Sequence, residues 1–182
     1  MRITIMSDTH GSRTAFQKAL EAAGPCDLIL HAGDILYHGP RNLLPEGYDP
    51  GELAQAINNL DKPFIAAAGN CDAPVDQLML SVPVQAPYAL VYLEHMLILV
   101  THGHAAGEEE LIGLARQWGV KLLVTGHTHV KRLEKRNGVY LLNPGSCALP
   151  KDGSPSVAVL EDFRVHFINI ESKETIQSQA LL

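Results

Sequence analysis

The feature that most constrains the fold of this chain is a short apolar run ending directly in a polar turn, a pattern that occurs five times. The side chains in these turns are Asp8 and His10, Asp34, Asn70, His102, and His127 with His129. Short apolar runs between turn residues are typical of buried strands. Because ligands gather at the carboxyl ends of strands in open α/β sheets, we expect these side chains to meet at one site.

In the first half of the chain, helical patterns separate the apolar runs. Strands are expected at 3–6, 28–30 and 64–67, and helices at 13–23 and 52–60. Phe16, Ala19 and Ala23 share one face of the first helix, and Gly24 with Pro25 ends it. Strands that alternate with helices predict parallel pairing through right-handed crossovers, so the expected fold class is α/β.

The second half is richer in strands. We expect a helix at 108–118 and strands at 88–93, 96–101, 121–125, 130–135, 139–142, 156–160 and 164–168. Asn137-Gly138 is a strong hairpin signal, and residues 172–182 are expected to form a strand or a loosely held tail. The length of 182 residues, with no linker and no repeat, predicts a single domain spanning 1–182.

Composition excludes several classes of protein. Hydrophobic residues make up 46% of the chain and charged residues 19%, an ordinary globular balance. The formal net charge of −6 argues against nucleic acid as a partner. No apolar run is long enough to cross a membrane, and no signal peptide is apparent. Cys26, Cys71 and Cys147 form no disulfide-like framework, so we expect a cytoplasmic protein.

The donors in the five turns indicate a metal centre. Three oxygen donors from Asp and Asn, with four imidazoles, suit Mn, Fe, Zn or Co better than Ca. Seven donors are too many for one ion, but they fit two ions that share a carboxylate. Two-metal sites of this kind serve phosphate chemistry.

The ordered motifs resemble those of the calcineurin-like metallophosphoesterase superfamily. They are Asp-x-His at Asp8, Gly-Asp at Asp34, Gly-Asn-x-Asp at Asn70, Thr-His-Gly-His at His102 and Gly-His-Thr-His at His127. Within this superfamily, the chain resembles the small bacterial YfcE-like phosphodiesterase branch, which has a segment like His38 to Tyr48. This resemblance implies two stacked mixed β-sheets flanked by helices, a four-layer α-β-β-α sandwich with the site at the rim of the sheets.

The resemblance also implies a ligand set. Asp8, His10 and His129 would hold the first metal, and Asn70, His102 and His127 the second. Asp34 would bridge the two ions, and a bridging hydroxide is the expected nucleophile. Mn²⁺ is the expected ion, with Zn²⁺, Fe, Ni²⁺ or Co²⁺ as alternatives.

Cys71 departs from the pattern of many relatives, which carry at this position a histidine thought to protonate the leaving group. A neutral thiol has an ordinary pKa of about 8.5 and is a poorly matched general acid beside imidazole. Cys71 is therefore either a weak acid or a small buried side chain. His104 is a second candidate for the leaving-group acid, or it orients a metal ligand. Gly-Asn-Cys-Asp itself fits the phosphodiesterase branch.

The long segment between Ile35 and Gly51 follows Asp34 directly. Arg41 is suited to bidentate contact with phosphate, and His38 is suited to contacting the substrate or donating a proton. The alternative is that Arg41 is a solvated surface charge. Because loops of this length are usually functional, we expect both residues to contact substrate.

Two further features are expected to be structural. His31 lies on a buried strand, so we interpret it as a packed histidine or one that supports a ligand. The turn Asn143 to Ser146 contains Pro and Gly, which favour a backbone bend near the site.

The function indicated is a two-metal phosphodiesterase that hydrolyses a small phosphodiester. A phosphomonoesterase or a nuclease on the same centre is the first alternative. A non-catalytic scaffold of the same fold is the second, although such modules tend to lose ligands and here all seven are present. A homo-oligomer, dimer or tetramer, is also possible.

Overall fold

A seven-stranded sheet forms one layer of the protein, and the computed structural model describes residues 1–181 of the chain. The strand order is β12-β11-β10-β1-β2-β3-β4. The parallel part consists of β1 (Arg2–Met6), β2 (Leu28–His31), β3 (Phe64–Ala67) and β4 (Val84–Gln85). The antiparallel part consists of β10 (Ser156–Glu161), β11 (Arg164–Asn169) and β12 (Thr175–Ala180). Antiparallel pairing of β10 with β1 joins the two parts.

A five-stranded sheet of order β5-β6-β7-β9-β8 lies against the first. Its strands are β5 (Ala89–Leu93), β6 (Met96–Val100), β7 (Leu122–Val124), β8 (Lys131–Arg136) and β9 (Val139–Pro144). The three central strands β6, β7 and β9 are parallel. Both sheets therefore contain a group of parallel strands. The carboxyl ends of these strands lie at the same rim of the two stacked sheets.

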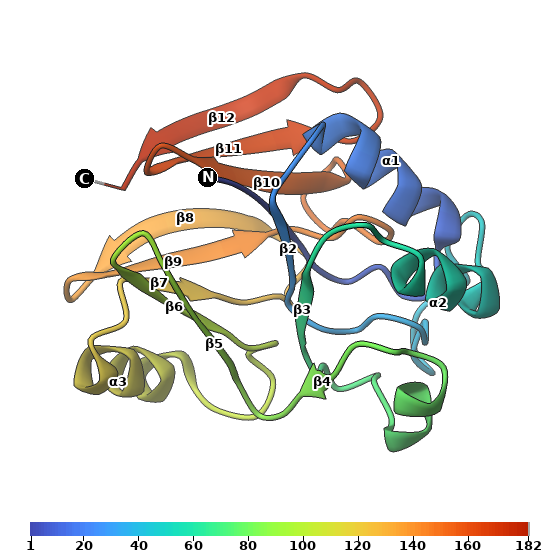
Figure 1. Cartoon of the computed structure of the whole chain (residues 1–182), viewed down its shortest axis with the longest axis horizontal. Coiled ribbons are helices and arrows are strands. Elements are labelled where there is room, and N and C mark those ends of the chain that lie inside the picture. The colour runs from blue at the N-terminus through green and yellow to red at the C-terminus, as the bar shows by residue number, and fades with distance from the viewer. Residues whose placement is uncertain (182) are drawn as a thin grey trace.

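Three apolar clusters define four layers (Figure 1). The first cluster joins the facing sides of the two sheets, with Ile5 and Leu30 packed with Ile98 and Val124. The second joins the seven-stranded sheet to α1 (Arg13–Ala23) and α2 (Pro50–Asn58). The third joins the five-stranded sheet to α3 (Glu108–Trp118). The expected α-β-β-α arrangement of two stacked mixed sheets is confirmed.

The elements expected from the sequence are present with small shifts at their ends. The helices at 13–23 and 108–118 have the expected bounds. The helix expected at 52–60 begins two residues earlier, because the Asp49 side chain accepts the backbone N–H of Glu52 and Pro50 occupies the first turn. Residues 175–180 form the strand β12, one of the two expected alternatives for the tail, whose last residue Leu182 lies outside the described part.

Two elements were not expected. A 3₁₀ helix, η1 (Pro74–Leu78), and the two-residue strand β4 both lie in the proline-containing segment between β3 and β5. Both are too short to produce a periodic pattern in the sequence. In residues 1–181, no helix is long and apolar enough to span a bilayer.

Candidate metal centre

The polar turns at the strand ends are joined by backbone hydrogen bonds. Asp8 and His10 follow β1, and their N–H groups donate to the carbonyl oxygens of Gly33 and Asp34 after β2, at 3.0 and 2.9 Å. In the other sheet, the N–H of Gly126 after β7 donates to the carbonyl oxygen of His102 after β6, at 3.1 Å. The expected convergence at the carboxyl ends of the strands is thus a property of the backbone itself.

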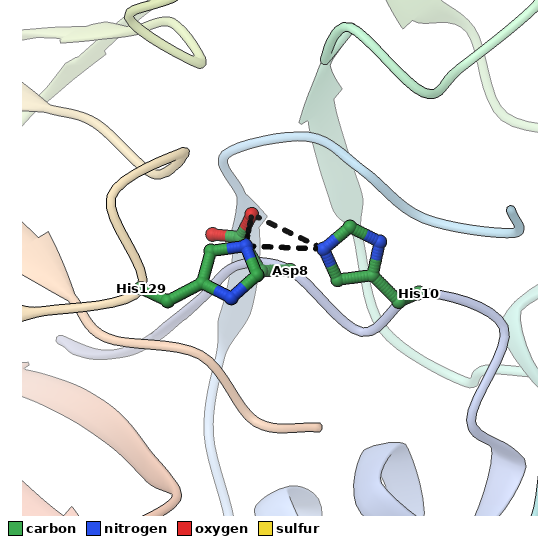
Figure 2. Close-up of side chains that lie close together, drawn as sticks. All are labelled: Asp8, His10 and His129. Carbon is green, nitrogen blue, oxygen red and sulfur yellow. Dashed lines mark hydrogen bonds and ion pairs between the residues drawn. The ribbon is translucent and has the colours of Figure 1, made fainter. Parts of the chain in front are cut away.

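Asp8, His10 and His129 point toward one another from two different sheets (Figure 2). The Nε2 atom of His129 lies 3.2 Å from Oδ1 of Asp8, and Nε2 of His10 lies 3.7 Å from the same oxygen. The two Nε2 atoms are 3.2 Å apart. All three side chains are buried.

Asp34 and His102 extend this cluster. Oδ2 of Asp34 lies 3.3 Å from Nε2 of His102 and 3.8 Å from Nε2 of His10. Nε2 of His102 is also 3.9 Å from Oδ1 of Asp8. Three overlapping sets, Asp8–His10–His129, Asp8–Asp34–His102 and His10–Asp34–Cys71, each place one ligand atom per residue within 4.8 Å of the others. The carboxylates therefore lie between two neighbouring groups of imidazoles.

Backbone carbonyls determine which nitrogen of each buried imidazole carries the proton. Nδ1 of His10 lies 3.0 Å from the Tyr37 oxygen, Nδ1 of His102 lies 2.7 Å from the Ala32 oxygen, and Nδ1 of His129 lies 2.6 Å from the Leu149 oxygen. A carbonyl oxygen only accepts, so each Nδ1 must donate. In the neutral rings, each Nε2 then presents its lone pair to the centre, as in metal-binding histidines.

Each carboxylate likewise has one oxygen satisfied by the protein and one directed at the imidazoles. Oδ2 of Asp8 accepts the Ser7 hydroxyl at 2.6 Å and the His127 N–H at 3.2 Å. Oδ1 of Asp34 accepts the Cys71 N–H at 2.7 Å. Oδ1 of Asp8 and Nε2 of His102 are buried and have no hydrogen-bond partner in the described residues. Buried acceptors that face one another fit a divalent cation between them.

The electrostatics of the cluster favour cations. Burial raises the pKa of Asp34, but the neighbouring His102 and the N–H of Cys71 outweigh it, so the net shift is downward and the carboxylate stays ionised. Asp8 shifts in the same direction, with His129 as the main opposing partner to burial. The pKa of His102 is raised overall, because Asp34 and Asp8 outweigh the effect of burial. A proton or a metal ion on Nε2 of His102 is thus stabilised by both carboxylates.

Asn70 and His127 lie beside this cluster as exposed side chains. The His127 ring centroid is 5.2 Å from that of His102, and the Asn70 amide donates to Sγ of Cys71 at 3.2 Å. Both residues line a cleft of about 440 Å³, which is also lined by Asp34 and His129. The structure therefore brings all seven expected ligands to one place, with five of them buried.

The backbone at the centre adopts an uncommon conformation. Positive φ angles of 46° to 66° occur at Asp8, His10, Asp34, His127 and His129. Outside the centre, the described non-glycine residues with positive φ are Glu94, His95, Asn137, Asp162, Phe163 and Lys173. This second group lies in the turns between consecutive antiparallel strands, where such angles are usual. At the centre they aim the donors inward from the strand ends.

Gly126 allows the turn after β7 to pack against the turn after β1. A Cβ atom at this position would lie 2.0 Å from Oγ of Ser7 and 2.8 Å from Oδ2 of Asp8. Only glycine permits this approach, which brings His127 and His129 within reach of Asp8.

Asp72 supports the turn that carries Asp34, a role that the sequence analysis missed. Its carboxylate accepts the N–H groups of Asp34 at 2.8 Å, Ile35 at 2.7 Å and Gly69 at 2.7 Å. These bonds join the turns after β2 and β3. The signal for this role was present as the aspartate that ends Gly-Asn-x-Asp.

His31 and Ser146 also brace the centre. Nδ1 of His31 accepts the Gly33 N–H at 3.1 Å, and its Nε2 lies 3.1 Å from the Thr9 hydroxyl. Burial lowers the pKa of His31 to about 3, so the ring is neutral and supports the turns on either side of it. The Ser146 hydroxyl donates to the carbonyl oxygen of Asp8 at 2.8 Å.

The two candidate leaving-group acids, Cys71 and His104, differ in position and in the direction of their pKa shifts. Burial and the nearby Asp34 carboxylate raise the pKa of the Cys71 thiol to about 12. The His104 ring lies 5.4 Å from the His102 ring, and burial together with His102 lowers its pKa. His104 lines a second hollow of about 410 Å³, which also borders Gly69 and Asp72.

The long loop after β2 brings one of its two expected substrate contacts into the cleft. Arg41 lines the cleft, whereas His38 is absent from its described lining. The His38 ring packs against Tyr37 and Tyr48, with centroid distances of 4.7 and 5.2 Å. Lys151, which follows the Asn143–Ser146 turn, lines the same cleft and was not singled out from the sequence.

Comparison with known proteins places these features in a family. Residues 1–162 match the model of the calcineurin-like phosphoesterase superfamily domain. The chain is 39% identical over 184 residues to phosphodiesterase YfcE of Escherichia coli, an alignment that covers 100% of this chain and 98% of that protein. It is 25% identical over 170 residues to a phosphodiesterase of Methanocaldococcus jannaschii, covering 88% and 93% of the two chains. The solved structure of E. coli YfcE, described as a phosphoesterase, superposes with a TM-score of 0.88 at 35% identity and covers both chains fully.

Proposed function

Because this chain belongs to the calcineurin-like phosphoesterase superfamily, a family of hydrolases, we propose that it is a two-metal phosphodiesterase acting on a small phosphodiester. The observation that carries the proposal is the group of buried acceptors formed by Asp8, Asp34 and three imidazoles. Their free oxygens and Nε2 atoms lie 3.2 to 3.9 Å apart, and a neutral ring whose Nδ1 donates to a carbonyl has no proton on Nε2 to share. Divalent ions would stabilise this arrangement.

We assign the ligands in two groups. Asp8, His10 and His129 would hold one ion, Asn70, His102 and His127 the other, and Asp34 would bridge them. The assignment is supported by the free oxygen on each buried carboxylate and by the three imidazoles whose Nδ1 atoms donate to carbonyls. When bound, two such ions supply a water of lowered pKa and neutralise charge on the phosphoryl oxygens. Mn²⁺ is the ion we expect.

The protein's own residues would orient the substrate and supply a proton. Arg41 lines the cleft and is suited to contact an anionic group of the substrate. We assign the leaving-group proton to His104, because a thiol with a pKa of about 12 is a poor donor at neutral pH. Cys71 is then a packing residue whose N–H holds Asp34 in place.

Metal reconstitution with paired substrates tests this proposal. The purified protein is stripped of metal, reloaded separately with Mn²⁺, Mg²⁺, Zn²⁺ or Ni²⁺, and assayed on bis(p-nitrophenyl) phosphate and p-nitrophenyl phosphate. We expect two Mn²⁺ per chain and faster hydrolysis of the diester. Faster hydrolysis of the monoester would favour a phosphomonoesterase. Fewer than one ion per chain, with neither ester hydrolysed, would favour a non-catalytic scaffold.

A further inference from the structure

The 440 Å³ cleft beside the metal centre contains two positive charges besides those that metal ions would supply. Arg41 comes from the loop after β2, and Lys151 comes from the segment after β9. These two segments are far apart in the chain, and both contribute to the lining of this cleft. The other polar residues of the lining include the proposed ligands Asp34, Asn70, His127 and His129.

Neither cation is neutralised by a carboxylate in residues 1–181, where no ion pair within 4.0 Å involves Arg41 or Lys151. Asp152, the acid nearest to Lys151 in sequence, is bonded instead to Nζ of Lys131 at 2.7 Å. The two acids that line the cleft are also occupied. Asp72 accepts three backbone N–H groups, and Asp34 belongs to the metal centre. Both positive charges are therefore available to a ligand.

The segment that carries Lys151 is attached to a proposed metal ligand. The N–H of Lys151 donates to the carbonyl oxygen of His129 at 3.0 Å, and the carbonyl oxygen of Leu149 lies 2.6 Å from Nδ1 of His129. The backbone of Lys151 is thus bonded directly to His129, while its side chain is exposed.

The loop that carries Arg41 also packs against a residue of the site. A Cβ atom on Gly39 would lie 2.8 Å from Sγ of Cys71, so the loop backbone packs directly against the residue after Asn70. The Asn42 side chain donates to the carbonyl oxygen of His38 at 2.7 Å and closes this turn of the loop. Arg41 is therefore presented from a compact turn and not from a long free segment.

We propose that Arg41 and Lys151 together bind a second anionic group on the substrate, so that the preferred substrate is a phosphodiester with one arm carrying a carboxylate or a phosphate. This proposal rests on the proposed phosphodiesterase function. A simple diester carries one negative charge, which the metal centre would balance. Two further cations at the cleft then match one additional anionic group near the scissile ester.

A series of diesters with a constant leaving group tests the proposal. Each substrate is a p-nitrophenyl diester whose second arm is methyl, choline, carboxymethyl or phosphoethyl, and KM and kcat are measured separately. We expect KM to be lowest for the two anionic arms, and to be highest for choline. The carboxymethyl and phosphoethyl arms distinguish the two kinds of anion.

Substitutions at the two cations should change this order. K151Q should raise KM for the anionic diesters about threefold to fivefold more than KM for the methyl diester, as for a solvent-accessible ion pair. K151R should restore most of the preference, and R41Q should act in the same direction as K151Q. Lys121 provides the control, because it is exposed, forms no ion pair in the described residues, and precedes β7 at the end opposite to the metal centre. K121Q should leave all four KM values unchanged.

A binding measurement separates failure of this proposal from failure of the proposed function. The methylphosphonate monoesters of ethanol and of glycolate are titrated calorimetrically into the Mn²⁺-loaded protein. If no diester is hydrolysed, the proposed function fails, but tighter binding of the glycolate ester that is lost in K151Q still supports the anionic site. Equal binding of the two esters, or equal KM shifts for all four substrates in K151Q, would overturn it.

Discussion

Asp8, His10 and His129 are buried, and each is held by bonds to neighbouring turns, whereas Asn70 and His127 are exposed. His10 and His129 have Nδ1 fixed by carbonyl oxygens, while the Asn70 amide donates only to the Cys71 thiol. The protein thus organises the first half of the proposed metal centre, Asp8–His10–His129, by itself. In the second half only His102 is buried and held through Nδ1, while Asn70 and His127 are exposed beside the cleft. We therefore expect the first half to bind its metal ion more tightly. We expect the side chains of the second, more exposed half to change position when substrate binds.

The largest effect should come from Asp34, which touches both halves. Asp34→Asn removes the charge between His10 and His102, so we expect metal content to fall below one ion per chain and kcat/KM on a diester to fall at least about 100-fold. Metal analysis and steady-state kinetics measure the two effects. The exposed Asp61 provides a matched control, and D61N should behave as the unmodified protein. Full activity in D34N would remove Asp34 from the centre.

Replacing one histidine from each half tests the comparison directly. His129→Ala should lower the affinity for the more tightly bound ion by more than the roughly 10- to 100-fold expected for loss of an outer-shell partner. It should also abolish most of the Mn²⁺-induced rise in Tm. His127→Ala should lose the weaker ion and retain most of that rise. Equilibrium dialysis and thermal unfolding with and without Mn²⁺ measure these outcomes. Equal losses in the two variants would show that the halves do not differ.

Loss of the Asp72 carboxylate, which supports the turn that carries Asp34, should have a smaller effect. In Asp72→Asn, one of the N–H groups of Asp34, Ile35 and Gly69 would face an amide NH₂, so we expect unfolding free energy to fall by about 1–3 kcal/mol. Asp76 accepts only the N–H of Ala73 at a partly exposed turn, so D76N should cost less. Urea unfolding of the metal-free proteins compares them. A loss in D76N as large as in D72N would contradict the assigned role of Asp72.

At neutral pH the smallest effect should come from His31, which acts through the pH dependence of stability. The folded pKa of His31, about 3, lies below its ordinary value of 6.5, so between these values the unfolded chain binds a proton that the folded chain does not. Stability should therefore fall as pH falls from 6.5 to 3, with a slope of up to about 1.4 kcal/mol per pH unit from this group. His31→Asn should reduce the slope for the metal-free protein, measured by urea unfolding. An unchanged slope would mean that His31 does not stay neutral.

The sequence predicted the proposed site better than the details around it. The turns at Asp8, Asp34 and Asn70 could be related because the ends of neighbouring parallel strands share one edge of a sheet, which is a rule independent of distant pairing. By contrast, β1 pairs with β10, which lies about 150 residues later in the chain. No local sequence pattern predicts such a long-range pairing. Family resemblance, and not periodicity, supplied the stacking of the two sheets.

Several side-chain roles were beyond sequence reasoning for physical reasons. His38 and Arg41 were treated alike because they share a loop, yet the His38 ring packs against tyrosines while Arg41 lines the cleft. Lys151 resembled any surface lysine until the fold placed it beside His129. In β12 the side chains are mostly exposed, so pairing with β11 is visible only in the backbone bonds.

The left-handed backbone at Asp8, His10, Asp34, His127 and His129 has a consequence for the evolution of this chain. Each such residue costs about 1 kcal/mol relative to glycine, which adopts these angles freely. Mutations to glycine at these five positions would relieve that cost while removing a proposed ligand. A lineage released from selection for catalysis would therefore meet no backbone penalty in replacing these side chains.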